Sequence, residues 1–234
     1  MSASVKIGEE SLMCVNCGRR VNSLYIQYSP GNIRLMKCEN CKAVADPYIE
    51  CEFMIILIDL ILHKPKAYRH LLYNTLNLKS VNIKGIIWRA SLLYLLLDAF
   101  RVFLLKTSND GWNSSRSSFM STSVCGKVLL DVFLGNIAFV SVLLLGTRFL
   151  IDCSFSITSY LEILLAVFVS SFFKMYLVAM MVWEFPSHVL YIIDVFVLSS
   201  NAVAFQVSTQ QETIRCIIIC LSAHAAKFLT DYWT

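Results

Sequence analysis

Four cysteines in two Cys-x-x-Cys pairs constrain the fold of this chain more than any other feature of its sequence. The pairs, here called knuckles, are Cys14–Cys17 and Cys38–Cys41, with twenty residues between them. Each knuckle presents two thiolates to one metal ion, and this spacing is typical of tetrahedral zinc sites. Four thiolates fill the coordination sphere and leave no position for water or substrate, so the predicted Zn has a structural role.

The segment between the knuckles has the pattern of a β-hairpin. Residues 24–28 and 33–37 have the composition of short strands, and residues 29–32 between them contain a turn-forming Pro-Gly pair. Gly18 directly follows the first knuckle, where a positive φ is usual and glycine adopts it without a side-chain clash. The order of knuckle, strand, turn, strand and knuckle predicts a zinc ribbon.

The alternative is that the four cysteines form two disulfides. Disulfides persist in oxidising compartments, which chains usually reach with a signal peptide. Residues 1–12 are polar and carry Lys6, Glu9 and Glu10, so they lack the apolar core of a signal peptide. We therefore expect a flexible N-terminus over 1–12 and a zinc ribbon in the reducing cytosol.

The composition indicates a membrane protein with a small soluble head. Hydrophobic residues make up 57% of the 234 residues, against about 45–50% in soluble domains. Charged residues make up 15%, and the mean hydropathy is +0.63. The apolar excess lies after residue 85. The net charge of +4 falls mostly beside the predicted membrane segments, which favours lipid headgroups over nucleic acid as a partner.

Four segments after residue 85 are long and apolar enough to cross a bilayer, which needs about 20 residues. They are residues 86–105, 128–151, 160–183 and 189–207, which form a predicted transmembrane bundle over 86–207. Residues 208–234 contain a shorter apolar run, for which we favour an interfacial helix over a short fifth span. The predicted fold class is an all-α polytopic membrane protein, with about four transmembrane helices and a small N-terminal zinc ribbon.

Residues 53–62 form an apolar run that is too short to span. At 100° per residue, a narrow polar stripe follows this run, made of Glu52, Asp59, His63, Lys66 and His70. Pro65 interrupts the helix. We interpret the segment as an amphipathic helix in the membrane interface, which directs Lys64, Lys66 and Arg69 toward anionic headgroups. The alternative is a helix that packs on the ribbon as its core.

The distribution of basic residues agrees with a cytosolic ribbon. Lys79, Lys84 and the basic residues between 64 and 69 lie before the first predicted span, as the positive-inside rule expects. The loop over 106–127 would then face the lumen, and it contains the glycosylation sequon that begins at Asn113.

Ionisable residues inside the predicted spans are candidates for a polar site. Asp98 and Arg101 are three residues apart and can pair on one helix face, whereas Lys174 and Asp194 need partners from other helices. Such groups usually face a bundle interior or a polar cavity, which would suit a sterol hydroxyl or a glycolipid head. The alternative is that they lie near the interface and snorkel to water.

The sequence contains no recognisable catalytic motif, so we predict that the protein is not an enzyme. A phosphate-binding glycine loop, a Gly-x-Ser-x-Gly elbow and a His-Glu-x-x-His site are all missing from it. For His188 and His224, at membrane segments, we favour satisfied interface residues over an acyltransferase base. Cys216 and Cys220 share a helix face with His224, and a weakly polar stripe is favoured there over metal ligation.

The N-terminal region resembles the homology domain of the Arv family. The resemblance covers residues 13–76 and combines the ribbon, the segment Asp46-Pro47-Tyr48-Ile49-Glu50, residues 58–62 and residues 67–74. Pro47 departs from the polar residue expected there. The resemblance singles out seven further residues without assigning them a role: Tyr48, Glu50, Asp59, Tyr68, Arg69, His70 and Asn74.

The resemblance implies a multi-pass protein of the endoplasmic-reticulum membrane that acts in sterol and lipid homeostasis. Its expected activity is the movement or distribution of sterols, with effects on sphingolipids and on glycosylphosphatidylinositol assembly. The expected partners are membrane lipids, sterols above all, and lipid-synthesis proteins, with no nucleic acid. The main alternative is a scaffold or accessory subunit of a lipid-synthesis complex, and a membrane enzyme with an unrecognised site is a third possibility.

Overall fold

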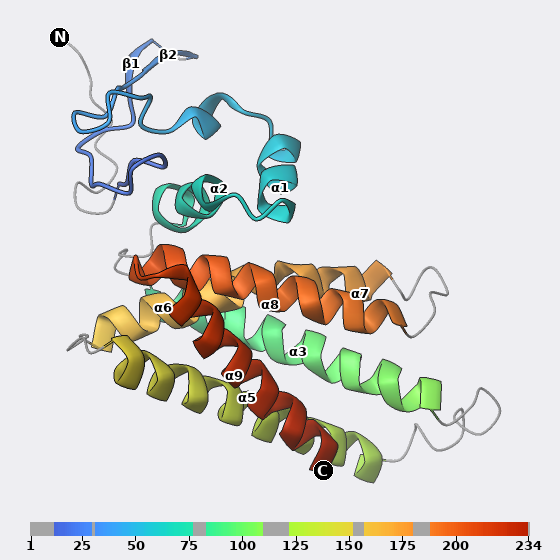
Figure 1. Ribbon diagram of the computed structural model, residues 1–234. Coiled ribbons are helices and arrows are strands. Elements are labelled where there is room, and N and C mark those ends of the chain that lie inside the picture. Colours follow the sequence, from blue (N-terminus) through green and yellow to red (C-terminus); the bar gives the residue numbers. More distant parts are fainter. Residues whose placement is uncertain are drawn as a thin grey trace. The chain divides into compact units, whose positions relative to one another are not determined.

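The computed structural model describes residues 12–29, 31–76, 83–109, 122–151, 157–179 and 188–233 (Figure 1). The chain divides into two compact units, Met1–Ile83 and Lys84–Thr234. We call them the ribbon unit and the helical bundle and describe each by itself. The predicted glycosylation site Asn113 lies outside the described residues, as does nearly all of the predicted flexible segment 1–12.

The ribbon unit contains the predicted hairpin. Strands β1 (Tyr25–Ser29) and β2 (Asn32–Leu35) pair antiparallel, with Tyr25 opposite Leu35. An isolated bridge closes the loop of each knuckle, Met13–Arg20 around the first and Lys37–Val44 around the second. The buried apolar core around the hairpin is small. It consists of Leu12, Leu24 and Ala45, with Val21, Tyr25 and Ile49 packed against it.

Four short helical elements follow the ribbon, and prolines begin two of them. They are the 3-10 helix η1 (Pro47–Glu50), α1 (Phe53–Ile61), α2 (Pro65–Arg69) and the π-helical segment η2 (His70–Thr75). Proline is favoured in the first helical turn because its missing N–H would have no partner there. Pro47 therefore suits its position, and the predicted interruption at Pro65 is confirmed.

The helical bundle consists of five long helices and two short elements within the described residues. They are α3 (Ile83–Asn109), α5 (Thr122–Ile151), α6 (Ile157–Ser170), η3 (Ser171–Met175), α7 (Tyr176–Ala179), α8 (His188–Thr209) and α9 (Thr213–Trp233). α5 and α9 lie side by side, and α8 packs against α6 and α9 (Figure 1).

Four stretches of these helices are long and apolar enough to cross a membrane. They are Gly126–Phe149, Ser159–Val178, His188–Thr209 and Thr213–Thr230. The protein is therefore an all-α polytopic membrane protein with about four transmembrane helices and a small N-terminal zinc ribbon. The count includes α9, whereas α3, which covers the predicted span 86–105, carries Arg89, Asp98 and Arg101 and is not among the four.

The bundle core lies where α5, α6, α8 and α9 meet. Its buried members are Phe139, Leu143, Ile163, Val167, Phe205, Cys216, Ile219, Cys220 and Ala223. The face of α9 that carries Cys216 and Cys220 therefore packs in the bundle core.

Gly146 of α5 faces Ile219 of α9, and a Cβ at Gly146 would lie 3.0 Å from Ile219 Cγ2. We expect Gly146→Leu to force the two helices apart and to reduce stability by about 1–3 kcal/mol, because overpacking strains a close-packed core. The measurement is the Tm of the purified protein in detergent. Gly126→Leu is the matched control, because a Cβ at Gly126 meets open space. Equal Tm values for the two variants would contradict the prediction.

Candidate metal centre and intramembrane charge cluster

The two knuckles of the ribbon unit fold alike. In the first, Cys14 N donates to Arg19 O at 2.8 Å and Gly18 N donates to Cys14 O at 2.9 Å. In the second, Cys38 N donates to Ala43 O at 2.8 Å and Lys42 N donates to Cys38 O at 2.9 Å. The residue after each knuckle has a positive φ, 74° at Gly18 and 60° at Lys42. Both loops therefore turn their two thiols toward one point.

The four thiols form the cluster that the spacing predicts. All four Sγ atoms lie within 4.8 Å of one another. The Cys14–Cys41 and Cys17–Cys38 Sγ pairs are 3.7 and 3.6 Å apart. A regular tetrahedron with Zn–S bonds of about 2.3 Å has edges of about 3.8 Å. The donor set and its dimensions therefore fit a tetrahedral thiolate-bound ion.

The pKa values of these thiols show why the cluster favours a cation. Burial raises the pKa of Cys14 to about 12. Burial also raises the pKa of Cys17, but hydrogen bonds from the Arg19 backbone and the Asn40 side chain outweigh it and lower that pKa to about 6. A hydrogen bond from Asn16 lowers the pKa of Cys41. Adjacent thiolates repel one another, so a divalent cation is what allows all four to ionise together.

Asp46 is the centre of a second, polar cluster in the ribbon unit. Its carboxylate is fully buried and accepts hydrogen bonds from Asn74 Nδ2 at 2.6 Å and from the Tyr48 backbone at 3.0 Å. His70 Nδ1 lies 2.7 Å from the same carboxylate, and His70 Nε2 lies 3.2 Å from Thr75 Oγ1. Asp46 thus joins η1 to η2.

Asn74 and Arg69 hold the helical elements to the knuckles. The Asn74 side chain accepts from Met13 N at 2.9 Å and donates to Met13 O at 3.0 Å. Arg69 Nη1 donates to the carbonyls of Val15 and Asn16 at 2.9 and 3.1 Å. The prediction that Arg69 points toward headgroups is therefore wrong, because its guanidinium binds the backbone carbonyls between Cys14 and Cys17.

The remaining residues singled out by resemblance fix α1 and α2. Tyr48 donates to Asp59 Oδ2 at 2.8 Å, and Tyr68 donates to Leu60 O at 3.2 Å. Lys64 Nζ lies 2.7 Å from Asp59 Oδ1, and this hydrogen bond lowers the pKa of Asp59. Burial raises the pKa of the Tyr48 hydroxyl. Glu50 is exposed. Six of the seven residues thus form hydrogen bonds within the ribbon unit.

We expect Asp46→Ala to destabilise the ribbon unit by about 1–3 kcal/mol for each buried donor that it leaves without an acceptor. The variant removes the carboxylate that accepts hydrogen bonds from the Asn74 side chain and the Tyr48 backbone N–H and that also contacts His70. The measurement is amide hydrogen exchange over residues 12–76 of the full chain. Glu50→Ala, in the same helical turn but exposed, is the control. Retained protection in Asp46→Ala would refute this role.

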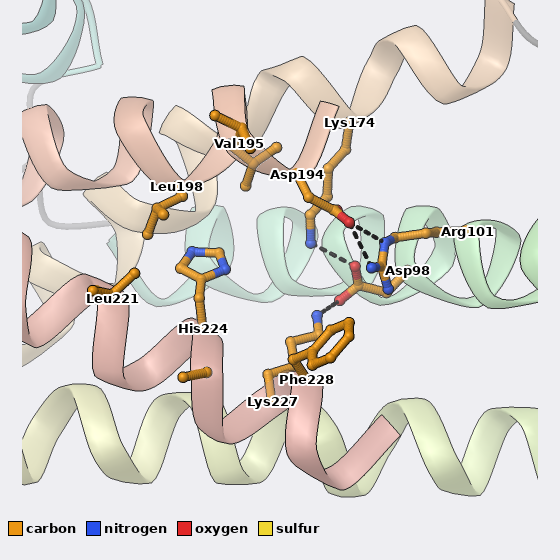
Figure 2. Close-up of a pocket in the computed structure, with 12 residues that line it drawn as sticks. Asp98, Arg101, Lys174, Asp194, Val195, Leu198, Leu221, His224, Lys227 and Phe228 are labelled. Carbon is orange, nitrogen blue, oxygen red and sulfur yellow. Dashed lines mark hydrogen bonds and ion pairs between the residues drawn. The ribbon is translucent and has the colours of Figure 1, made fainter. Parts of the chain in front are cut away.

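Within the helical bundle, Asp98 of α3 is paired with lysines from two other elements (Figure 2). Asp98 is 2% exposed, and Lys174 Nζ of η3 lies 2.5 Å from its Oδ1. Lys227 of α9 donates to Asp98 Oδ2 and, at 3.0 Å, to Asn136 Oδ1 of α5. Lys174 Nζ also lies 3.4 Å from the centre of the Tyr94 ring. The sequence predicted a partner on another helix for Lys174 but not a role for Lys227.

A second ion pair lies beside the first (Figure 2). Arg101 Nε and Nη2 donate to Asp194 Oδ2 of α8 at 3.1 and 2.6 Å. Arg101 is 8% exposed, and the Asp194 side chain is 33% exposed. Asp194 thus has the partner on another helix that the sequence required.

His224 of α9 belongs to a neutral polar network. Ser170 and Ser171 Oγ lie 2.6 and 3.1 Å from Asn201 Oδ1. Asn201 Nδ2 lies 3.1 Å from His224 Nε2, so the Asn201 amide connects the two hydroxyls to the imidazole. The His224 ring also meets the Phe139 ring edge-on, with centroids 4.9 Å apart. His224 is the satisfied residue that the sequence favoured, and Asn201 was missed. His188, at the start of α8, is exposed.

Two cavities open beside these groups. The charged cavity, of about 270 Å³, is lined by both ion clusters, by His224 and by the apolar residues Val195, Val197, Leu198, Leu221, Ala225 and Phe228 (Figure 2). The uncharged cavity, of about 250 Å³, lies among α3, α5 and α6. Its lining residues are Ser91, Tyr94, Leu95, Phe133, Asn136, Ile137, Val140, Ser141 and Phe168.

Comparison with known proteins finds relatives of this chain. Residues 13–205 match the Arv1-like family. Protein ARV 2 of Arabidopsis thaliana is 50% identical over 225 residues, which cover 96% of each chain. Protein arv1 of Schizosaccharomyces pombe is 31% identical over 94% of this chain and 84% of its own. Protein ARV1 of Homo sapiens is 29% identical over 83% of this chain and 71% of its own. No solved structure matches the chain.

Proposed function

This chain belongs to the Arv1-like family, and we propose that it is a non-enzymatic protein of the endoplasmic-reticulum membrane that distributes sterols from that membrane. Through this activity it maintains sterol, sphingolipid and glycosylphosphatidylinositol homeostasis. The observation that carries the proposal is the uncharged cavity in the helical bundle.

The lining of the uncharged cavity suits the shape and chemistry of a sterol. Phe133, Ile137 and Phe168 provide apolar walls for a flat ring system, and the hydroxyls of Ser91 and Ser141 provide partners for a single sterol hydroxyl. Its volume of about 250 Å³ is slightly below the roughly 300–1,000 Å³ of small-molecule pockets. The cavity therefore accommodates the hydroxyl end of the sterol, with the remainder along the lipid-facing surface.

The knuckle cluster supports a structural zinc ion, held by Cys14, Cys17, Cys38 and Cys41. The Zn would neutralise the thiolates and fix the two knuckles that Arg69 and the hairpin contact. Because free thiolates persist in reducing compartments, the ribbon unit is assigned to the cytosol. Glycosylation at Asn113 would then mark the lumenal loop.

Helix α1 supports attachment of the ribbon unit to the membrane interface. Its hydrogen-bonded side packs within the unit, while a contiguous apolar side is exposed. The exposed residues are Phe53, Met54, Ile55, Ile58 and Leu62. A large exposed apolar surface on a membrane protein suits the boundary between headgroups and acyl chains, and exposed Lys64 and Lys66 suit anionic headgroups.

Crosslinking of the full chain in membranes to a photoactivatable sterol tests the proposal. We expect saturable labelling that unlabelled sterol competes away and that Ser141→Trp abolishes by filling the cavity. Leu145→Trp, one turn further along α5 and outside the lining, is the matched control. Labelling that is absent from the wild-type protein, or equal in both variants, would overturn sterol binding at this site.

A scaffold function is the second candidate, favoured by the exposed edge of the hairpin. Tyr28 is 61% exposed beside half-buried Tyr25, Ile26 and Ile33, so the hairpin offers an aromatic surface to a lipid-synthesis protein. Stable co-purification with such an enzyme, lost in Tyr28→Ser and accompanied by no sterol labelling, would favour this function. Turnover by the purified protein that disappears on replacing His188 or His224 would instead indicate an enzyme.

A further inference from the structure

We propose that the charged cavity binds the phosphate headgroup of an anionic membrane lipid. This site is separate from the uncharged cavity, so the proposal goes beyond sterol distribution and does not depend on it.

The charges that line the cavity do not balance. Arg101, Lys174 and Lys227 contribute three basic side chains, and Asp98 and Asp194 contribute two carboxylates, so the lining has a formal excess of one positive charge with His224 neutral. Uncompensated charge is strongly unfavourable in a hydrocarbon surrounding. An anionic group in the cavity would remove the excess, whereas a sterol hydroxyl would not.

The lysines retain hydrogen-bonding capacity after their contacts within the bundle. An ammonium group has three N–H donors. Within the described part of the chain, Lys174 directs one donor to Asp98 and lies over the Tyr94 ring, and Lys227 directs donors to Asp98 and Asn136. The Tyr94 ring stabilises the charged form of Lys174, because its face attracts cations. Each lysine thus keeps a donor for a phosphate oxygen.

The apolar part of the lining indicates that the phosphate belongs to a lipid. Val195 of α8 and Leu221 and Phe228 of α9 line the cavity and are 64%, 53% and 57% exposed at the bundle surface. Figure 2 shows Phe228 beside Lys227 and Leu221 on the side of the cavity where His224 lies. Acyl chains attached to the bound phosphate would continue along this apolar surface between α8 and α9, whereas a free phosphate ion would leave it uncovered.

Native mass spectrometry of the purified full chain in detergent tests the proposal with defined lipids. We expect phosphatidic acid to be retained at least about tenfold more tightly than diacylglycerol or zwitterionic phosphatidylcholine, a difference of about 1.4 kcal/mol. Equal retention of the three lipids would overturn the proposal. Displacement by inorganic phosphate at the same concentration as the lipid would show that the site takes free phosphate, which would also overturn it.

Variants that change the charge of the cavity lining test whether binding of phosphatidic acid depends on that charge. Asp194→Asn raises the excess positive charge and should tighten binding of phosphatidic acid, whereas Arg101→Gln removes the excess and should weaken it by at least about tenfold. Asp194 is partly exposed, which favours folding of the first variant. Asp131→Asn, which removes a carboxylate outside the lining, is the control. Wild-type affinity in both lining variants, with an unchanged Tm, would overturn the proposal.

Discussion

Replacement of Cys38 by serine is expected to release the proposed zinc ion and to unfold the ribbon unit. Structural zinc sites contribute about 10–16 kcal/mol to the folding of small domains at neutral pH. The apolar cluster beside the hairpin has three buried members among the described residues, Leu12, Leu24 and Ala45, so the hairpin and the knuckles depend on the metal site for much of their stability. The measurement is the zinc content of the purified full chain, together with hydrogen-exchange protection over residues 12–76.

Cys51→Ser is the matched control for this experiment. Cys51 lies in the same unit, but its thiol donates to Pro47 O at 3.4 Å and is not part of the four-cysteine cluster. We expect this variant to keep one zinc ion per chain and full protection. A Cys38→Ser protein that also keeps its zinc and its protection would contradict the assignment of the cluster.

Replacement of Asp98 by leucine is expected to prevent stable folding of the helical bundle. The variant leaves the ammonium groups of Lys174 and Lys227 buried without their shared carboxylate, and loss of one partner from a buried ion pair reduces stability by about 3–5 kcal/mol. The measurement is monodispersity and Tm in detergent, relative to the wild-type protein.

A compensating variant distinguishes lost charge pairing from lost packing. Asp98→Leu combined with Lys174→Met and Lys227→Met removes all three charges and keeps apolar volume. We expect it to recover much of the stability, because well-packed apolar groups replace buried ion pairs at little or no loss of stability. A triple variant no more stable than Asp98→Leu alone would show that the ion pairs are not the reason for the effect.

The features that the sequence predicted are those set by residues close together in the chain. The knuckle spacing, the hairpin between them and the interruption at Pro65 each depend on a few neighbouring residues. The resulting cysteine cluster, the antiparallel strands and the separate helices α1 and α2 confirm these predictions. Three of the four predicted spans coincide with stretches that are long and apolar enough to cross a membrane. The fourth such stretch lies in α9, where the sequence favoured an interfacial helix, and not in α3.

The features that the sequence did not predict depend on pairs that are distant along the chain. Asp46 accepts from Asn74, 28 residues away, and Lys227 pairs with Asp98, 129 residues away. Helical periodicity places each of these residues on a face but does not say which face of another helix it meets. The predicted direction of the Arg69 side chain was wrong for the same reason. Its partners are backbone carbonyl groups, and every residue has one, so the sequence does not identify which of them Arg69 binds.

The three-way junction of Met13, Asp46 and Asn74 gives the ribbon unit the topology of a cross-linked polymer. Asn74 contacts Met13, 61 residues earlier, and Asp46, 28 residues earlier, so two large loops close at a single node. When the Asn74 contacts break, both loops become free and gain conformational entropy at the same time. The entropic cost of closing a loop grows only slowly with its length, so the two loops contribute similar amounts. We therefore expect the hairpin and the helical elements of the ribbon unit to unfold in one cooperative step, because the Asn74 contacts join its two ends.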